Sequence, residues 1–235
     1  AANTISLEAK GEEMDVPSIR RAALGLAGDV PVVQSIFSYL RGGNIDQMAF
    51  QSKGNSLEDL GRTANITIQG SLTKGDVFVP GPRLAFRDVE GKCDITNGIL
   101  KASDVTGEIG GSRVKSGAFG VGLKGADAPF HLDAAVSADL NDVNVILRNV
   151  IKDKDFLEEL GHVRSINGKA EGRLVLGESL ARIIPRINIK TMSFKSVYDR
   201  APYPVEIKKG SFSYDEKGAA VKDLYGTVGR SSFTG

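Results

Sequence analysis

The chain has 235 residues, and its 30 lysines and arginines nearly balance 29 aspartates and glutamates, leaving a formal charge of +1. This balance excludes the strongly basic field that non-specific binding to nucleic acid requires. One cysteine and two histidines do not make a structural zinc site, and we expect neither a metal nor a cofactor. The 28 glycines, the 6% aromatic content and the lack of Trp indicate many short strands joined by tight turns.

The first predicted elements are a strand that begins at Ile5 and two helices. Asp15 and Asp29 each stand where a helix N-cap is expected, and each is followed two residues later by a proline. An apolar stripe with helical spacing continues from the second start, and Gly42-Gly43 ends it. The stripe consists of Val33, Ile36, Phe37 and Leu40.

From residue 66 the hydrophobic period changes from 3.6 to 2, which predicts antiparallel hairpins. Lys74-Gly75 and Asn97-Gly98 are read as turns, the second as a type I′ signal. The lone Cys93 alternates with Ile95 on the apolar side, so a buried thiol is expected there. The clearest alternation runs from Phe130 to Ala138.

A second helical interruption follows the alternating strands. Asn141 can cap a helix that continues to Val150, and a shorter helix stops at Gly161. Strand alternation then resumes and continues to Tyr214. We therefore predict a mainly β fold with minor α, in which repeated antiparallel hairpins form a long twisted sheet that can curve into a groove, with two helical insertions.

An internal repeat relates the two halves of the chain. Asp104 and Ser112 bound a glycine-containing motif that recurs between Asp223 and Ser231, 119 positions later. The structural glycines of the repeat are Gly91, Gly107, Gly110, Gly210, Gly226 and Gly229. We predict repeat unit 1 over about 16–138 and an incomplete unit 2 over about 139–235. Since no leader precedes the first strand, residues 1–235 are expected to be one continuous segment of a longer protein.

No motif in the chain predicts catalysis. Ser-x-x-Lys begins at Ser71 and again at Ser112, but in strand sequence, where positions i and i+3 face opposite ways. The glycine-rich run 107–112 lacks the following Lys-Ser/Thr and helix of a phosphate loop. His131 and Asp133 share one strand face without an evident third metal ligand. A non-enzymatic protein is expected.

The apolar face of the predicted sheet is longer than the predicted helices can cover. Either two halves close over each other as a β-sandwich, an adhesion or interaction module, or the sheet forms a trough for an apolar ligand. The sequence pattern is the same for both. In a trough, an aliphatic lane would bind acyl chains without polar contacts. The candidate lining residues are Ile66, Ile68, Val77, Val79, Leu84, Phe86, Phe119, Val121, Leu132, Val136, Leu174, Ile187, Ile189, Val205 and Ile207.

The first unit contains Gly70-Ser71-Leu72, Val77-Phe78-Val79-Pro80-Gly81, Gly110-Gly111-Ser112 and the strand Ala128-Pro129-Phe130-His131-Leu132. In these residues it resembles the AsmA-like proteins of Gram-negative bacteria. The resemblance implies a repeated β-groove like that of chorein-type bridge proteins, in a periplasmic protein with an inner-membrane anchor. It also implies phospholipid as the bound partner, transport between the inner and outer membranes, and membrane-protein partners contacted through regions outside this chain.

Overall fold

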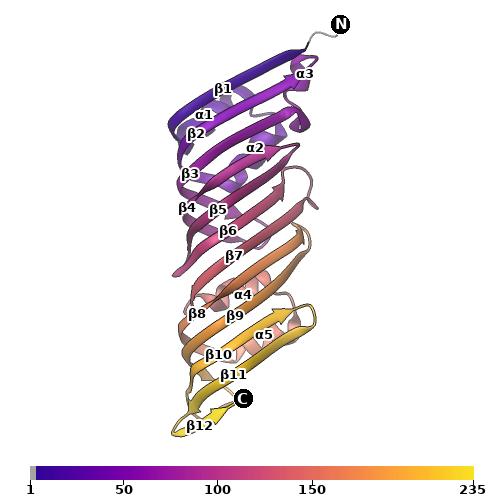
Figure 1. The fold of residues 1–235 in the computed structure, drawn as a ribbon. Helices are drawn as coiled ribbons and strands as arrows, with labels where there is room; N and C mark the ends of the chain where they lie inside the picture. Colours follow the sequence, from indigo (N-terminus) through magenta and orange to yellow (C-terminus); the bar gives the residue numbers. More distant parts are fainter. Residues whose placement is uncertain (1–3) are drawn as a thin grey trace.

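The computed structural model describes residues 4–235, without the side chain of Val32, as one antiparallel sheet with helices on one face (Figure 1). Its twelve strands lie in sequence order, each beside its neighbours in the chain. The strands are β1 (Ile5–Asp15), β2 (Leu40–Gly54), β3 (Ile66–Val79), β4 (Leu84–Thr96), β5 (Ile99–Ile109), β6 (Ser112–Gly122), β7 (Pro129–Asp139), β8 (Val163–Ser179), β9 (Ile183–Tyr198), β10 (Val205–Asp215), β11 (Gly218–Val228) and β12 (Ser231–Thr234).

Five α-helices and one short 3₁₀ turn connect these strands within the described residues. They are α1 (Val16–Ala27), α2 (Pro31–Tyr39), α3 (Leu57–Leu60), η1 (Thr63–Asn65), α4 (Val143–Val150) and α5 (Lys154–Gly161). The predicted class, mainly β with minor α and a groove-like sheet, is confirmed. The alternative of two facing sheets is not formed, because the described strands make a single sheet.

The helix starts agree with the prediction in one case and differ in two. Asp15 caps α1, and its carboxylate accepts a hydrogen bond from the Ser18 amide at 2.8 Å. For α2 the N-cap is Val30, one residue after the predicted Asp29, and no side chain caps it. The predicted cap Asn141 instead donates its side-chain amide to Asp139 at 2.7 Å, and α4 begins after the following residue.

One predicted turn is a bulge. Lys74-Gly75 lies inside the continuous strand β3, and the chain turns later, at Pro80–Arg83. Lys74 has a φ of 50°, and the pairing of β3 with β4 shifts on both sides of Gly75. A left-handed residue serves a bulge as well as a turn, so local chemistry alone does not separate the two. Asn97-Gly98 is a turn, with φ values of 53° and 72°.

Left-handed residues recur at matching places on neighbouring strands. Gly43 on β2 has a φ of 114°, and a methyl group added there would lie 2.6 Å from Gly75 Cα on β3. Lys74 on β3, Asp88 on β4 and Asp104 on β5 have φ values of 50°, 48° and 55°. Bulges bend a strand and increase its local twist. These strands therefore change direction together while their pairing continues beyond the bulges.

Both long helical connections leave and re-enter the sheet at the same end of the strands. This helix-bearing end is marked by Asp15, Leu40, Asp139 and Val163, the strand residues next to the helices. The helices then reach across to the opposite end. Ser35 on α2 donates its hydroxyl to the Leu123 carbonyl at 2.9 Å, and the ring of Phe156 on α5 lies 5.1 Å from that of Tyr214. The two helix pairs thus form a roof over one face of the sheet.

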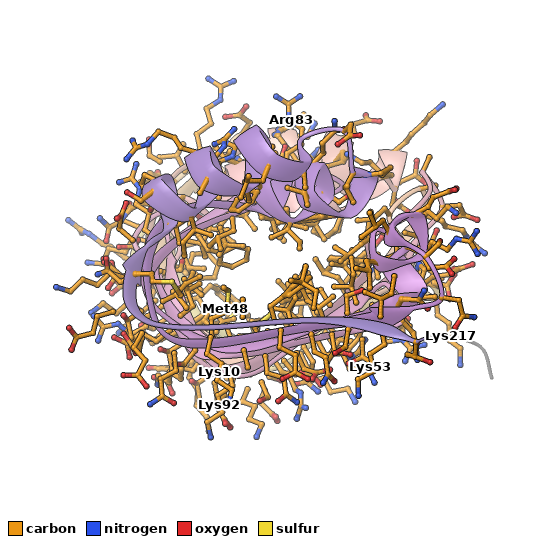
Figure 2. All side chains as sticks on the ribbon, turned by 90° about the horizontal axis from the view of Figure 1, so that it is seen from above. Lys10, Met48, Lys53, Arg83, Lys92 and Lys217 are labelled. Carbon is orange, nitrogen blue, oxygen red and sulfur yellow. The ribbon has the colours of Figure 1, made fainter. Side chains whose placement is uncertain are left out.

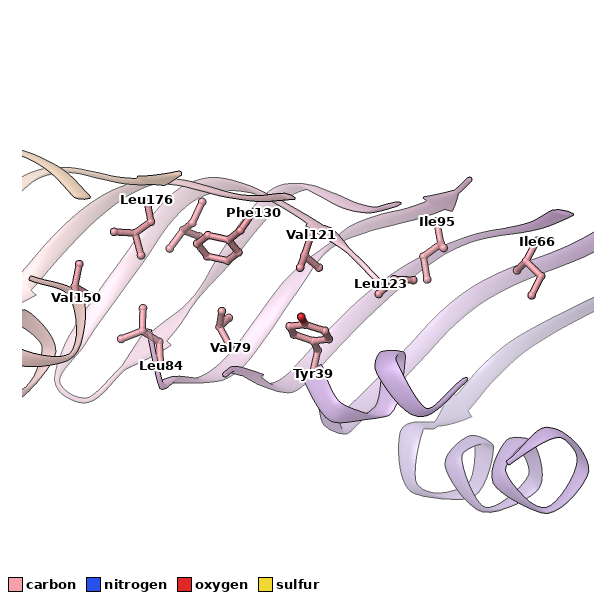
Figure 3. Close-up of a cluster of buried hydrophobic side chains, with 11 residues drawn as sticks. Tyr39, Ile66, Val79, Leu84, Ile95, Val121, Leu123, Phe130, Val150 and Leu176 are labelled. Atoms are coloured by element: carbon pink, nitrogen blue, oxygen red, sulfur yellow. The ribbon is translucent and has the colours of Figure 1, made fainter. Parts of the chain in front are cut away.

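The strand ends also meet each other beneath this roof. The β3–β4 turn lies at the helix-bearing end, and Leu180 lies at the opposite end. The two segments nevertheless come close together, because a methyl group added to Gly81 would lie 3.2 Å from the Leu180 carbonyl oxygen. Figure 3 shows Val79 and Leu84 pointing toward Phe130 and Leu176 from the other side. These side chains belong to one buried apolar cluster, and they hold the two sides of the molecule together.

Glycines at which two neighbouring strands approach closely give a direct test of the strand pairing. A methyl group on Gly172 of β8 would overlap the Asn188 carbonyl oxygen and lie 2.7 Å from Ile189 Cα, both on β9. We expect Gly172→Ala to lower the free energy of unfolding by about 1–3 kcal/mol, because backbone atoms have to move apart. Denaturant unfolding followed by circular dichroism measures the effect.

The matched control is Gly177→Ala on the same strand. A methyl group there would meet nothing closer than His131 Nδ1 at 3.9 Å. This substitution should leave the unfolding free energy within about 0.5 kcal/mol of the original. Equal effects of the two substitutions would contradict the close approach of β8 and β9.

Candidate functional site

The face of the sheet under the helical roof, called the inner face here, carries an uncharged row of side chains. Cross-strand pairing aligns one residue from each of eight strands in this row. The row consists of Gly11, Met48, Gly70, Cys93, Ala102, Phe119, Leu132 and Leu176. Because neighbours along a strand point to opposite faces, the adjacent residues of each strand lie on the outer face.

All fifteen predicted lining residues lie on the inner face. Strand pairing connects them directly or through inner-face partners, as in Val77 with Phe86 and Leu174 with Ile187. They fall into two groups by exposure. The buried group is Ile66, Val79, Leu84, Val121, Leu132, Ile187 and Ile207. The half-buried group is Ile68, Val77, Phe86, Phe119, Val136, Leu174, Ile189 and Val205.

The half-buried group shows that the inner face is not filled by the protein's own side chains. Ile68, Phe119 and Leu174 lie on interior strands and point under the roof, yet each of these residues remains partly accessible to solvent. Figure 2 looks along the stack of strands with the described side chains drawn, and the centre between sheet and helices is free of them. Met48 points into this space, whereas Lys10 and Lys92 point away from it. We call this space the inner groove.

Aromatic residues close part of the inner groove between the roof and the sheet. Tyr39, the last residue of α2, packs edge-on against Phe119 with ring centroids 6.4 Å apart, and Phe119 packs against Phe130 at 5.7 Å. Edge-to-face packing of this kind adds to the stabilisation from burial alone. A second cluster joins Ile151, which follows α4, to Ile187 and Tyr214. The groove is therefore apolar on its roof as well as on its floor.

Sequence reasoning missed the contribution of β2 to the inner groove. Met48 pairs with Gly70, and Phe50 pairs with Ile68, so both lie on the inner face. Their alternation was the available signal. This alternation covers few residues, because register shifts near Gly42 and Ile45 interrupt the two-residue period in the N-terminal part of β2. The roof residues could not be assigned to the groove from the sequence, because helical spacing does not say which sheet face a helix covers.

The repeated motif has the same backbone conformation in both copies. Asp104 and Asp223 have φ values of 55° and 53°, and Gly110 and Gly229 have values of 57° and 59°. Gly107 and Gly226 are both buried, and an added methyl group would be crowded at either position. Gly91 is half-buried and Gly210 is buried, without a left-handed φ. These residues shape the strands and hairpins, and Gly107 and Gly226 lie on the inner face, where they pair with Val114 and Ile207.

Two residues considered for catalysis or metal binding, Ser112 and Asp133, have structural partners. The Ser112 hydroxyl is buried and accepts a hydrogen bond from the Asp139 amide at 3.0 Å. Two hydrogen bonds of 2.6 Å from Arg173 hold the Asp133 carboxylate, and they lower its pKa. The run 107–112 forms the β5–β6 hairpin. Among residues 4–235, no three His, Cys, Asp or Glu side chains are grouped so that they could hold a metal ion.

A cavity of about 990 Å³ crosses β1 to β7, and the side chains that line it, such as Lys10, Gln69 and Lys92, belong to the outer face. Its walls are two rows of outward-pointing residues, and the backbone of the row between them forms its floor. Charges of both signs alternate along it, as at Lys10, Glu12, Lys92 and Asp94. A shallow surface of mixed charge selects no single class of ligand.

Comparison with protein-family models, with curated proteins and with solved structures finds no match in any of the three. Within the described residues, no helix has both the length and the apolar composition needed to cross a bilayer. The chemical character of the inner groove is therefore the basis for any assignment of function.

Cys93 is a chemical probe of the inner groove. Burial raises the pKa of its thiol to about 11 from a usual value of 9.0, and the Asp94 carboxylate adds to the rise. At pH 8 the thiolate fraction should then be about a hundredfold smaller than in the unfolded chain. We expect alkylation of the folded protein by iodoacetamide to be slower by at least that factor. Equal rates in buffer and in denaturant would contradict the half-buried, inward-facing position of this thiol.

Proposed function

We propose that this chain is a non-enzymatic lipid-binding segment whose inner groove shelters the acyl chains of phospholipids. The observation that carries the proposal is the half-burial of apolar side chains, such as Phe119 and Leu174, that point under the roof. Apolar surface that its own fold leaves accessible gains free energy when a hydrocarbon chain covers it. The ligand is thus expected to be aliphatic and elongated.

The strength of such binding follows from the chemistry of the groove. Each methylene group moved from water to an apolar surface contributes roughly 0.8 kcal/mol, so a stretch of about ten covered methylenes would contribute several kcal/mol after ordering costs. The central row presents glycine, alanine, methionine, cysteine, leucine and phenylalanine side chains but no charge. A charged or strongly polar ligand would lose its hydration there without gaining a partner.

The shape of the sheet supports movement of the ligand along the groove. Twelve strands about 4.8 Å apart give a stack roughly 50 Å long, and the groove follows the stacking direction in Figure 2. Contacts along it are made by side chains of one chemical kind, so no single position dominates the binding. The proposal includes the resemblance to AsmA-like envelope proteins, and hence a periplasmic segment between the inner and outer membranes, with its anchor outside this chain.

Site-specific photocrosslinking tests where the lipid lies. Ile68 and Gln69 are neighbours on β3, but Ile68 faces the inner groove and Gln69 faces outward. A benzoylphenylalanine placed at position 68 should crosslink to copurifying phospholipid after irradiation, and one at position 69 should not. Mass spectrometry of the adducts measures both. Crosslinking of similar yield at the two positions would count against binding inside the groove.

A charge placed on the groove floor should displace the ligand. Ile68→Glu introduces a carboxylate among the inner-face side chains, whereas Thr67→Glu places the same charge on the outer face of β3. We expect Ile68→Glu to lower the amount of phospholipid bound by at least fivefold, because the carboxylate keeps its hydration. Native mass spectrometry after detergent-free purification measures the bound fraction. The idea fails if the unmodified protein carries no phospholipid, or if both variants retain it fully.

A further inference from the structure

Opposite ends of the strands contact each other at the β3–β4 turn. A methyl group on Gly81, in this turn, would lie 3.4 Å from Leu180 Cδ2 and 3.8 Å from Ile183 Cδ1, both at the β8–β9 turn. We call this contact the seam. The paired strands from β4 to β8 complete a ring with it, so the inner groove is enclosed on all sides at the seam.

Apolar side chains fill the seam. Val79 and Leu84 stand on one side of it, and Phe130 and Leu176 stand on the other (Figure 3). Each of the four exposes 3% or less of its surface, and all belong to one buried cluster. While the seam is closed, their packing leaves no path by which a polar group could leave the groove sideways.

Each side of the seam is hydrogen-bonded within itself. The Arg83 amide donates to the Pro80 carbonyl at 3.2 Å, and the Leu180 amide donates to the Ala128 carbonyl at 2.9 Å. Among residues 4–235, no hydrogen bond or ion pair joins 79–84 to 123–130 or to 174–183. The seam can therefore open by separating apolar surfaces, and both turns keep their own hydrogen bonds when it does.

A phospholipid that moves along the groove meets a conflict at the seam. Its acyl chains are well placed among apolar side chains, but its phosphate would lose its hydration inside the ring. The side chains that face the groove there, Val79, Leu84, Phe130 and Leu176, offer neither a charge nor a hydrogen bond in compensation. The headgroup therefore has to pass on the outside, and this requires an open seam.

We propose that the seam is a gate for the lipid headgroup. It opens to let the headgroup pass outside the groove while the acyl chains move beneath it, and it closes again behind them. Opening exposes apolar side chains, and acyl chains lying under the seam cover part of that surface. The gate thus opens more readily over a lipid than over an empty groove. This inference rests on the proposed function, since it concerns the movement of the same lipid.

A covalent bridge across the seam tests the gate. Gly81→Cys/Leu180→Cys, in a Cys93→Ala background, is closed by oxidation to a disulfide, or by dibromobimane if the disulfide does not form. The delipidated protein is anchored by an N-terminal histidine tag to vesicles of phosphatidylcholine, phosphatidylglycerol and a nickel-chelating lipid, so that the β1 end faces the lipid source. A benzoylphenylalanine reports lipid before the seam at position 68, on β3, or beyond it at position 212, on β10.

The unbridged protein is the matched control and should give phospholipid adducts at both positions. With the seam bridged, we expect adducts at position 68 to stay within about twofold and those at position 212 to fall at least about tenfold, because the headgroup cannot enter the ring. Reduction of the disulfide should restore them. Hexadecane mixed into the vesicles has no headgroup, so it should reach position 212 in both states.

The outcomes separate the gate from the groove. Equal phospholipid adducts at position 212 in the bridged and unbridged proteins would overturn the gate and leave the groove intact. Loss of phospholipid at both positions, or of hexadecane at position 212, would show that the bridge distorts the groove, and the headgroup argument would be overturned. If the unbridged protein gives no phospholipid adduct at position 68, the proposed function itself is wrong and the gate falls with it.

Discussion

The phase of side-chain alternation across the sheet is the constraint on which this structure depends. In a strand, a slip of one residue moves every side chain to the other face. The chain keeps its apolar side chains on one face over twelve strands, although several strands contain bulges. This works because the bulges recur at neighbouring places, such as Lys74 and Asp88, so the partners change direction together. The uncharged row from Gly11 to Leu176 exists only because pairing stays in phase through these strands.

The roof converts this apolar face into a groove with a limited opening. Both helix pairs start and finish at one end of the strands and reach residues of the other end, as the Ser35–Leu123 hydrogen bond shows. Beneath the helices, side chains such as Phe119 remain half-buried.

Strand periodicity made much of this fold predictable from local pattern. The alternation from Phe130 to Ala138 gave β7 and its inner face directly, and the fifteen lining residues share one face because period 2 is a backbone property. Which of these fifteen lining residues are buried and which are half-buried was not predictable from the sequence. It depends on contacts between distant segments, such as the β3–β4 turn against Leu180, and no local pattern encodes them. Strand β2 was missed for a related reason, since the bulges that let it bend also interrupt its alternation.

The strictly sequential order of the strands has a mechanical consequence. Every strand is hydrogen-bonded only to the strands before and after it in the chain, and β1 and β12 lie at opposite ends of the stack (Figure 1). Tension between the two outer strands would load the hydrogen-bond ladders in series. The molecule would then lengthen by peeling away one hairpin at a time, at modest force, while the remaining strands kept their pairing and could zip the lost hairpin back when the load fell.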